Sequence, residues 1–241
     1  PVVWPGDPNT TFENYDGLPS NVYAAISISF SGVSLWGSDI AGYTGVSNPP
    51  STKELYIRWT QFGAFLPIMR THHGTNTDKN WRFSKDEETT EIFKKYAIWH
   101  TRLFPYLKSL HNESVEKGTP IIRHLYLEFP DEALKVIQSE DAYLLDEEYM
   151  LGPYILVAPV IRDKAREKRL YLPEGKWKDL FTGEDYEGGK IITVDAPLDK
   201  IPVFIRDGVK IPMLSENEVP DTLVQRTPNL SQKIRTISDL R

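Results

Sequence analysis

Short apolar runs alternate with amphipathic helical stretches over roughly the first 120 residues, and polar side chains follow each apolar run. The runs are Val2–Trp4, Val33–Trp36 and the stretch "LPIMR" at residues 66–70. Strand, helix, strand, helix in this order predicts a parallel α/β arrangement. Because the carboxyl ends of parallel strands meet at one edge, we expect Asp7, Asp39 and residues 70–72 to lie there together.

Three stretches between and after these strands have helical features. Residues 20–31 are ambiguous, because one set of apolar positions alternates like a strand and another repeats like a helix. Ser51 with Glu54 forms a capping box that predicts a second helix, whose apolar stripe is Leu55, Trp59, Phe62 and Phe65. A third helix is expected from Ser84, with Glu87 three residues on, to Gly118 and Pro120, kinked at Pro105. Its stripe is Ile92, Phe93, Tyr96, Trp99, Leu103, Leu107 and Leu110.

The pattern changes near Pro153. Four short apolar or alternating runs follow, "YILVAPVI", "REKRLYLP", "KIITVDAP" and "IPVFIRDGVKIPM", separated by turn residues. Such runs predict an antiparallel sandwich or barrel. The last stretch, from residue 214 to residue 241, is polar and lacks strong periodicity, so we expect a tail or the beginning of a further β domain.

Composition excludes several classes of protein. The chain of 241 residues has a net charge of −6 with both signs interspersed, which argues against a nucleic-acid partner. No apolar run is long enough to predict a membrane span. Cysteine is absent, which excludes disulfides and thiolate ligands and fits a reducing compartment, so we expect a cytoplasmic location. Secretion stays open, since a leader could precede residue 1. The opening "PVVW" lacks a preceding connection for its strand, so we expect the sequence to be a piece of something larger.

Asp7 and Asp39 are the first candidates for chemistry. Asp7, in "WPGD", is most simply a turn residue that bonds its local backbone. The functional alternative is a carboxylic acid held near Trp4 among apolar neighbours, where burial would keep it protonated and able to donate. Asp39, in "GSDIAG", follows a buried strand and could accept hydrogen bonds from hydroxyls. Two carboxylates near tryptophans suggest a sugar site rather than a phosphate site.

The histidine pair does not suggest a metal site. His72 and His73 would point to opposite faces of a strand, and no third ligand stands at a suitable spacing. One histidine facing a pocket is the simpler interpretation, and Arg70 would share its face at a spacing of two. No nucleotide-binding fingerprint or serine elbow is present, so neither a cofactor nor a metal is expected.

Several longer motifs resemble one known family. They are "VVWPGD", "GSDIAGYTG", "RWTQFGAFLPIMRTHHG", "NWRF", "PYL", "TPIIRHLYLEFP", "YMLGPYILVAPV" and "YLPEGKWKDLFTGE". In this order they resemble the C-terminal half of glycoside hydrolase family 31, the α-glucosidase and α-xylosidase family, over about residues 1 to 213. The resemblance implies the C-terminal part of a (β/α)8 TIM barrel over residues 1–130 and a β-sandwich domain over residues 131–213. It also implies that residues 20–31 are a barrel helix.

The resemblance further implies roles for six residues. Asp7 matches the general acid/base, and Trp4 matches a wall of the subsite for the nonreducing sugar. Asp39 and His72 match positions that hydrogen-bond sugar hydroxyls, Arg70 a supporting polar position, and Tyr43 an aromatic lining position. The turn reads "PGD" here in place of the family's "GGD" or "TGD".

One member of the expected site is missing. Retaining hydrolysis needs a second carboxylate about 5–5.5 Å from the first, as the nucleophile. In the family this aspartate lies on an earlier barrel strand, so no residue here takes the role, and we expect the chain to need the other half of its barrel as a partner. Association of copies of the chain with one another is left open.

The function expected is that of a retaining α-glycosidase acting on terminal nonreducing α-linked sugars, with an α-linked oligosaccharide or glycoside as the ligand. α-Glucosides are the first choice. α-Xylosides and sulfoquinovosides remain alternatives, because the segment from "SDIAGYTG" to "SKDEET" is especially similar to bacterial members that include sulfoquinovosidases. Two further alternatives are a fragment without activity of its own and a carbohydrate-binding piece.

Overall fold

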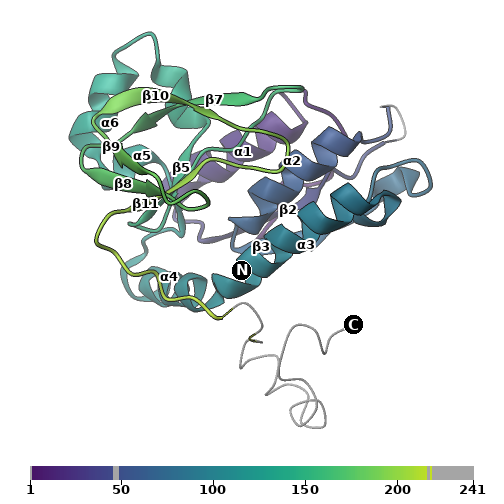
Figure 1. Ribbon diagram of the computed structural model, residues 1–241, viewed down its shortest axis with the longest axis horizontal. Coiled ribbons are helices and arrows are strands. Elements are labelled where there is room, and N and C mark those ends of the chain that lie inside the picture. Colours follow the sequence, from purple (N-terminus) through teal and green to yellow (C-terminus); the bar gives the residue numbers. More distant parts are fainter. Residues whose placement is uncertain (1, 46–48, 216–217, 219–241) are drawn as a thin grey trace.

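The computed structural model describes residues 2–45, 49–215 and 218. A small parallel sheet with its helices forms one side of the molecule, and antiparallel strands form the other (Figure 1). Most of the stretch expected to be a tail or a further β domain lies outside the described residues.

The parallel sheet has the order β1-β2-β3, from strands β1 (Val2–Val3), β2 (Leu35–Ile40) and β3 (Ile68–Thr71). Val3 pairs with Trp36, and Asp39 pairs with Arg70, so all three strands run the same way. Helix α1 (Leu18–Ser27), continued by a 3-10 turn (Ile28–Ser31), connects β1 to β2, and α2 (Lys53–Ala64) connects β2 to β3. This alternation confirms the predicted parallel arrangement and the helical assignment of residues 20–31. β2 begins and ends later than expected, so that Asp39 lies within the strand.

The N-cap of helix α2 (Lys53–Ala64) lies one residue after the predicted cap, Ser51. Thr52 is the N-cap, and its hydroxyl accepts the backbone N–H of Leu55 at 3.2 Å. Ser51 instead accepts the backbone N–H of Trp81 at 2.8 Å, so the predicted capping box is wrong. The predicted apolar stripe is buried throughout, because α2 packs on β2, β3 and α3 (Glu87–Arg102) and its C-terminal end contacts Tyr149 of the antiparallel part.

The third helix is two helices, α3 (Glu87–Arg102) and α4 (Phe104–Lys117), separated at Leu103. Pro105 breaks the helix there instead of kinking it, since proline has no N–H for the preceding turn and its ring needs space. Asp86 caps α3 by accepting the backbone N–H of Thr89 at 2.7 Å, which corrects the prediction that Ser84 begins this helix. Gly118 ends α4 in the left-handed conformation, as expected.

Antiparallel strands make up most of the remaining structure. A six-stranded sheet has the order β4-β5-β6-β11-β8-β9, and β7 pairs with β10 beside it. The strands are β4 (Ile122–Arg123), β5 (Tyr149–Leu151), β6 (Ile155–Val157), β7 (Glu167–Leu172), β8 (Lys176–Asp179), β9 (Asp185–Glu187), β10 (Lys190–Asp195) and β11 (Val203–Arg206). The short helices here are α5 (Leu125–Glu128), α6 (Pro130–Ile137) and a 3-10 turn (Ala142–Asp146), and two further 3-10 turns (Gly74–Asn76, Phe83–Lys85) follow β3. Each of the four runs predicted after Pro153 contains a strand.

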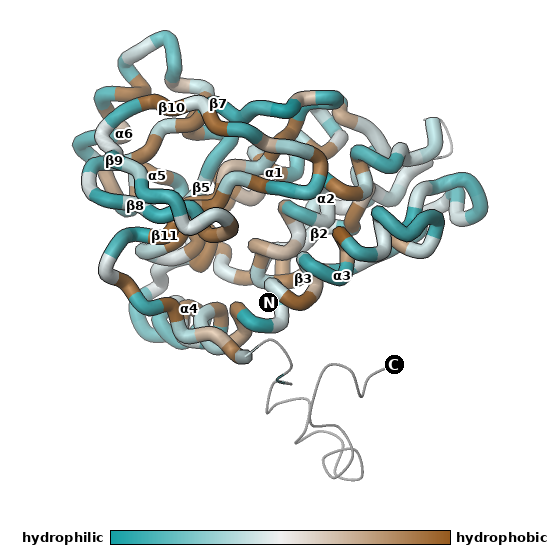
Figure 2. The backbone as a smooth tube through the Cα atoms, in the orientation of Figure 1, coloured by the Kyte–Doolittle hydropathy of each residue, from teal (hydrophilic) through white to brown (hydrophobic). Residues whose placement is uncertain are grey.

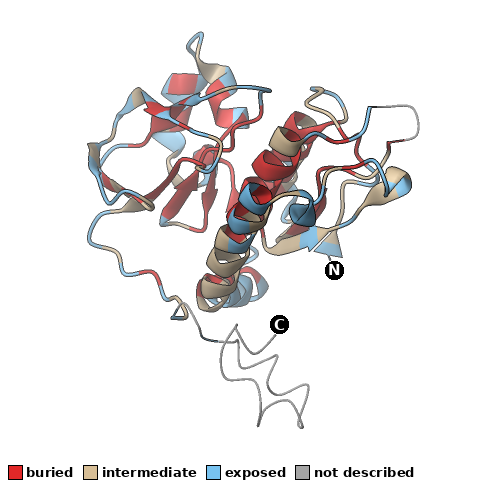
Figure 3. Ribbon diagram, turned by 45° about the vertical axis from the view of Figure 1, so that its right-hand side comes forward, coloured by how far each residue is buried: buried red, intermediate tan, exposed pale blue. Residues whose placement is uncertain are grey.

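Two hydrophobic clusters hold these elements together. The larger joins the parallel sheet and its helices to β5, β6 and β11, and the smaller lies between the antiparallel strands and α5 and α6. Figure 2 shows apolar chain concentrated in the interior and polar chain on many of the outer loops. Figure 3 shows that α1 and α2 carry long buried stretches where they face the antiparallel part. The larger cluster is therefore a core that the parallel and antiparallel parts share.

Arg58 on α2 is the main polar connection between the two parts. Its buried guanidinium donates to the carbonyl oxygens of Ala165, Ala196, Pro197 and Lys200 at distances of 2.8 to 3.1 Å. Gln61, one turn on, donates to the carbonyl oxygen of Leu198 at 2.7 Å. These bonds hold the segments that lead into β7 and β11 against the barrel helix.

Candidate active site

The six residues predicted to form the site lie at or beyond the carboxyl ends of the three parallel strands. Trp4 and Asp7 follow β1, Asp39 lies near the end of β2 with Tyr43 beyond it, and Arg70 and His72 are at the end of β3. The topology therefore brings residues from three separate stretches of the sequence to one edge of the sheet.

Asp39 and Arg70 form an ion pair at this edge, in which the carboxylate is buried and the guanidinium is partly exposed. The Asp39 carboxylate, whose side chain is 2% exposed, accepts a hydrogen bond from Arg70 Nε at 2.7 Å. The register explains the contact, since the two residues are direct partners across β2 and β3. Arg70 is about half exposed, and only its Nε is bonded to the described part of the chain. Its terminal nitrogens are therefore available to a ligand.

Trp4 extends this pair into a row. The Arg70 guanidinium carbon lies 4.6 Å from the centre of the Trp4 ring, a cation–π contact. The ring fits against β2 because residue 37 is glycine: a Cβ there would lie 2.4 Å from Trp4 Cζ3. Gly37 thus creates the space in which Trp4 can lie beside Arg70. The indole N–H is buried, and no described residue accepts a hydrogen bond from it.

Asp7 lies on the turn after Trp4 and is exposed. The expectation that apolar neighbours bury this carboxyl is wrong for the described structure. Gly6, with a φ of +87°, turns the chain so that Asp7 extends beyond the sheet edge. The turn is nevertheless fixed, because the Thr44 hydroxyl donates to the Asp7 carbonyl at 2.9 Å and the Tyr43 N–H donates to the Pro8 carbonyl at 2.7 Å.

Tyr43 and His72 form a second pair at the same edge. Their ring centroids are 4.9 Å apart, with the planes inclined at 50°. His72 Nδ1 accepts the backbone N–H of Gly74 at 3.1 Å. An accepting Nδ1 carries no proton, so in this arrangement the imidazole proton is on Nε2. His72 pairs with Tyr43 while Arg70 pairs with Asp39 and Trp4, and β3 ends at Thr71, between the two.

The sequence did not indicate a role for three loop residues whose contacts hold this edge together: Thr44, Gly74 and Thr75. They stand in loops without hydrophobic periodicity, and their contacts join residues about thirty positions apart. Among the described residues no three histidine, aspartate or glutamate side chains are placed to hold a metal ion. Within the same residues no helix is long and apolar enough to cross a membrane.

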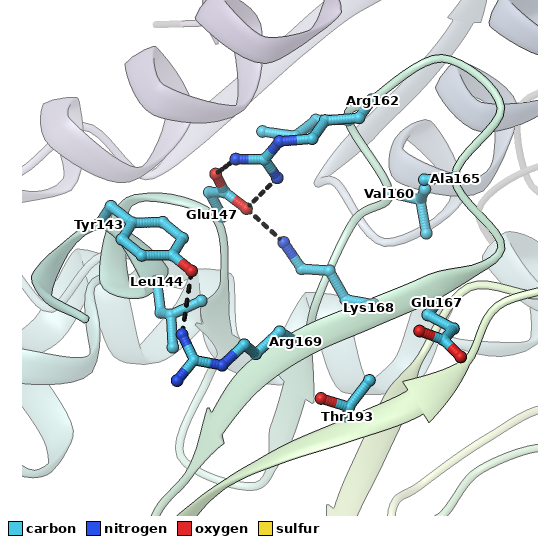
Figure 4. Close-up of a pocket in the computed structure, with 11 residues that line it drawn as sticks. Tyr143, Leu144, Glu147, Val160, Arg162, Ala165, Glu167, Lys168, Arg169 and Thr193 are labelled. Carbon is cyan, nitrogen blue, oxygen red and sulfur yellow. Dashed lines mark hydrogen bonds and ion pairs between the residues drawn. The ribbon is translucent and has the colours of Figure 1, made fainter. Parts of the chain in front are cut away.

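A pocket of about 460 Å³ lies beside β7, and charged side chains make up about half of its lining (Figure 4). Glu147 is at its centre, with Arg162 bonded to both carboxylate oxygens and Lys168 donating to one of them at 2.7 Å. Arg169 is paired with Asp141 and bonded to the Tyr143 hydroxyl. Its cations are already paired, so this pocket is better explained as a structural charge network than as a ligand site.

Comparison with known proteins places this arrangement in a family. Residues 1–110 match the glycosyl hydrolases family 31 TIM-barrel domain, and residues 118–211 match the family 31 C-terminal domain. The chain belongs to glycosyl hydrolase family 31. The family confirms the expected fold, a TIM-barrel portion followed by a β-rich C-terminal domain, and also the resemblance found in the motifs.

Family 31 relatives differ in the sugar named for them. The sulfoquinovosidase of Escherichia coli K12 is 42% identical over 205 residues, which are 85% of this chain and 29% of that protein. The α-xylosidase of Saccharolobus solfataricus is 35% identical over 220 residues, 90% of this chain and 28% of that protein. A solved sulfoquinovosidase from E. rectale, in complex with an aza-sugar inhibitor, superposes with a TM-score of 0.78 at 36% identity, covering 87% of this chain and 30% of that one. The chain thus spans about 30% of the length of these family 31 proteins.

Proposed function

We propose that this family 31 chain carries the acid/base side of the active site of a retaining α-glycosidase. The observation that supports it is the meeting of Asp7, the Asp39–Arg70 pair, Trp4 and the Tyr43–His72 pair at the carboxyl edge of three consecutive parallel strands. Catalytic groups of barrel enzymes occupy this edge. A carboxylic acid beside bonded polar groups and aromatic faces suits a sugar ligand.

Each group has a defined task in this proposal. Asp7 protonates the departing glycosidic oxygen and then accepts a proton from the attacking water. Asp39, Arg70 and His72 hydrogen-bond the hydroxyls of the terminal sugar, and Trp4 and Tyr43 contact its apolar faces. The nucleophile, a second carboxylate about 5–5.5 Å from Asp7, comes from a further barrel strand beside those described. That part of the enzyme would also enclose Asp7.

Among α-linked sugars we favour a sulfoquinovoside over the α-glucoside that the sequence alone put first. The support is that the E. coli relative and the E. rectale structure are both sulfoquinovosidases. A sulfonate is a permanent anion that needs hydrogen-bond donors, and this edge offers two beyond those that bind hydroxyls: the Tyr43 hydroxyl, at the far end of the ring that contacts the sugar, and a second terminal nitrogen of Arg70. The α-glucoside is the alternative that the assay below must compare.

The test is hydrolysis of nitrophenyl α-sulfoquinovoside, α-glucoside and α-xyloside by the chain alone and by the enzyme that contains the remaining barrel strands. We expect activity only in the second case, with the sulfoquinovoside hydrolysed fastest. Asp7→Asn should lower kcat by about 10²- to 10⁴-fold, since it removes the general acid/base. Asp195→Asn, an exposed aspartate on β10, is the matched control and should leave kcat unchanged.

Two outcomes would contradict the proposal. Full activity of Asp7→Asn on all three glycosides would show that another group is the acid/base. Oligosaccharide binding without turnover by the enzyme that contains the remaining strands would instead indicate a carbohydrate-binding protein.

The native mass of the purified material, compared with 27.6 kDa for one chain, decides whether copies of the chain associate.

A further inference from the structure

The loops that follow β2 and β3 are joined by a set of short contacts around Tyr43, at the edge where His72 lies. The Tyr43 carbonyl accepts the backbone N–H of Thr75 at 3.0 Å and the Thr75 hydroxyl at 3.4 Å. The same hydroxyl accepts the backbone N–H of Gly45 at 3.0 Å, and the Asn76 amide donates to the Gly45 carbonyl at 3.3 Å. One threonine therefore bonds the first loop on both sides of Thr44.

Gly74 makes this close approach sterically feasible. Its φ is +62°, and a Cβ on it would lie 2.0 Å from the Tyr43 carbonyl oxygen. A side chain at position 74 would require the backbone at Tyr43 or at residue 74 to shift, which would change the contact between Tyr43 and His72. The Gly74 N–H is also the donor to His72 Nδ1. The same two residues, Gly74 and Thr75, thus determine both the position of Tyr43 and the protonated nitrogen of His72.

We propose that Thr75 and Gly74 are positioning residues for sugar recognition, which hold Tyr43 against His72 and keep the imidazole as the tautomer with its proton on Nε2. His72 then presents a fixed N–H donor to an oxygen of the sugar, while Tyr43 cannot swing away from it. This inference rests on the proposed function for the identity of the ligand. The geometry of the clasp, defined as Tyr43, Gly45, Gly74, Thr75 and Asn76, does not depend on that function.

The kinetic test uses the enzyme with the remaining barrel strands and the variant Thr75→Val, which keeps the shape of the side chain and removes its hydroxyl. We expect KM for the preferred glycoside to rise about five- to tenfold, the effect of losing roughly one hydrogen bond, with kcat changed less than about twofold. Thr75→Ser should restore KM. Thr77→Val, an exposed threonine in the same loop, is the matched control and should leave KM unchanged.

The second test reads the imidazole directly and needs no activity. Nitrogen NMR of His72 in the enzyme that contains the remaining barrel strands, at neutral pH, should show the Nε2–H tautomer, and Gly74→Ala should change the His72 signals because it displaces Tyr43. If the wild type hydrolyses no glycoside but His72 shows this tautomer, the proposed function fails and the clasp stands. The clasp itself is overturned if His72 carries its proton on Nδ1, if Thr75→Val behaves like Thr77→Val, or if Thr75→Ser fails to restore KM.

Discussion

Glu147 and Glu148 are consecutive, both are buried, and their pKa values shift in opposite directions. Burial alone would raise the pKa of Glu147, but hydrogen bonds from Arg162 and the nearby charge of Lys168 outweigh it and lower that pKa. Complete burial raises the pKa of Glu148 well above its usual range, although its oxygens accept the Tyr171 N–H at 3.0 and 3.3 Å. Glu147 accepts hydrogen bonds from Arg162 and Lys168, whereas Glu148 accepts its bonds from the Tyr171 N–H and interacts with Lys168 through charge alone, which does not offset its burial.

This contrast predicts different results for the two isosteric amides. Glu147→Gln should lower the free energy of unfolding by about 3–5 kcal/mol at neutral pH, because it leaves Lys168 buried without its carboxylate. Since the pKa of Glu147 is lowered by folding, its contribution is present above the unfolded pKa and is lost as the pH falls through the folded one. The difference in the free energy of unfolding between the wild type and Glu147→Gln should therefore become smaller at acidic pH.

Glu148→Gln is the matched variant with the opposite expectation. A carboxyl whose pKa is raised by folding costs stability as the pH rises above its unfolded pKa, so the neutral amide should be as stable as the wild type or more stable at neutral pH. Urea unfolding across the pH range measures both variants. Equal losses for the two would contradict the distinction between them.

At the scale of elements, the N-caps of α2 and α3 determine where the loops of the candidate site end. The loop after β3 ends at Asp86, which caps α3 and also accepts a hydrogen bond from Lys53, near the start of α2, at 2.6 Å. That bond lowers the pKa of Asp86 to about 2, so the cap remains ionised over the whole range in which the protein would be assayed. The two helices that follow the site strands are thus joined at their first turns.

Asp86→Ala should lower the melting temperature, because it removes the acceptor for the Thr89 N–H at the beginning of α3. Ser84→Ala is the control, since its hydroxyl has no part in that cap, and it should melt with the wild type. Thermal unfolding followed by circular dichroism compares the two. If Ser84→Ala lowered the melting temperature more than Asp86→Ala, the result would support Ser84 as the cap, as the sequence suggested.

At the scale of the whole molecule, Arg58 connects the barrel portion to the antiparallel domain. Arg58→Met should lower the free energy of unfolding by about 3 kcal/mol, since it removes a buried donor from four backbone carbonyls, of which those of Ala165 and Pro197 keep another donor. It should also speed proteolytic cleavage within residues 162–166 and 196–200, the segments that Arg58 holds.

Arg166→Met is the matched control for Arg58. Arg166 also contacts Glu54, but its side chain is 48% exposed, so we expect a loss of less than about 1 kcal/mol. Chemical denaturation and timed proteolysis measure both variants. If Arg58→Met is no worse than Arg166→Met, the two parts of the chain are held by their shared apolar core alone.

Much of the fold could be read from local patterns. The alternation of apolar runs and helical stripes indicated the parallel sheet, and the turn-punctuated runs after Pro153 indicated the antiparallel strands, because burial imposes these periods on a sequence. Helix caps were misplaced by one or two residues at Ser51 and Ser84, since several polar residues at each start could cap equally well and packing selects among them. At residues 20–31 the spacing of apolar residues fitted both a strand and a helix, and only the family motifs indicated the helix.

For the candidate site as well, the sequence predicted the residues but not the contacts between them. Which residue types follow each strand is visible in the sequence, and from this we could predict that Asp7, Asp39, Arg70 and His72 would meet at one edge. How they pair depends on the folded chain: Asp39 pairs with Arg70 through the strand register, and Trp4 lies over Arg70 in the space at Gly37. The folded chain also places Tyr43 against His72 through Gly74 and Thr75. Pairing depends on contacts between loops far apart in the chain, which no local pattern records.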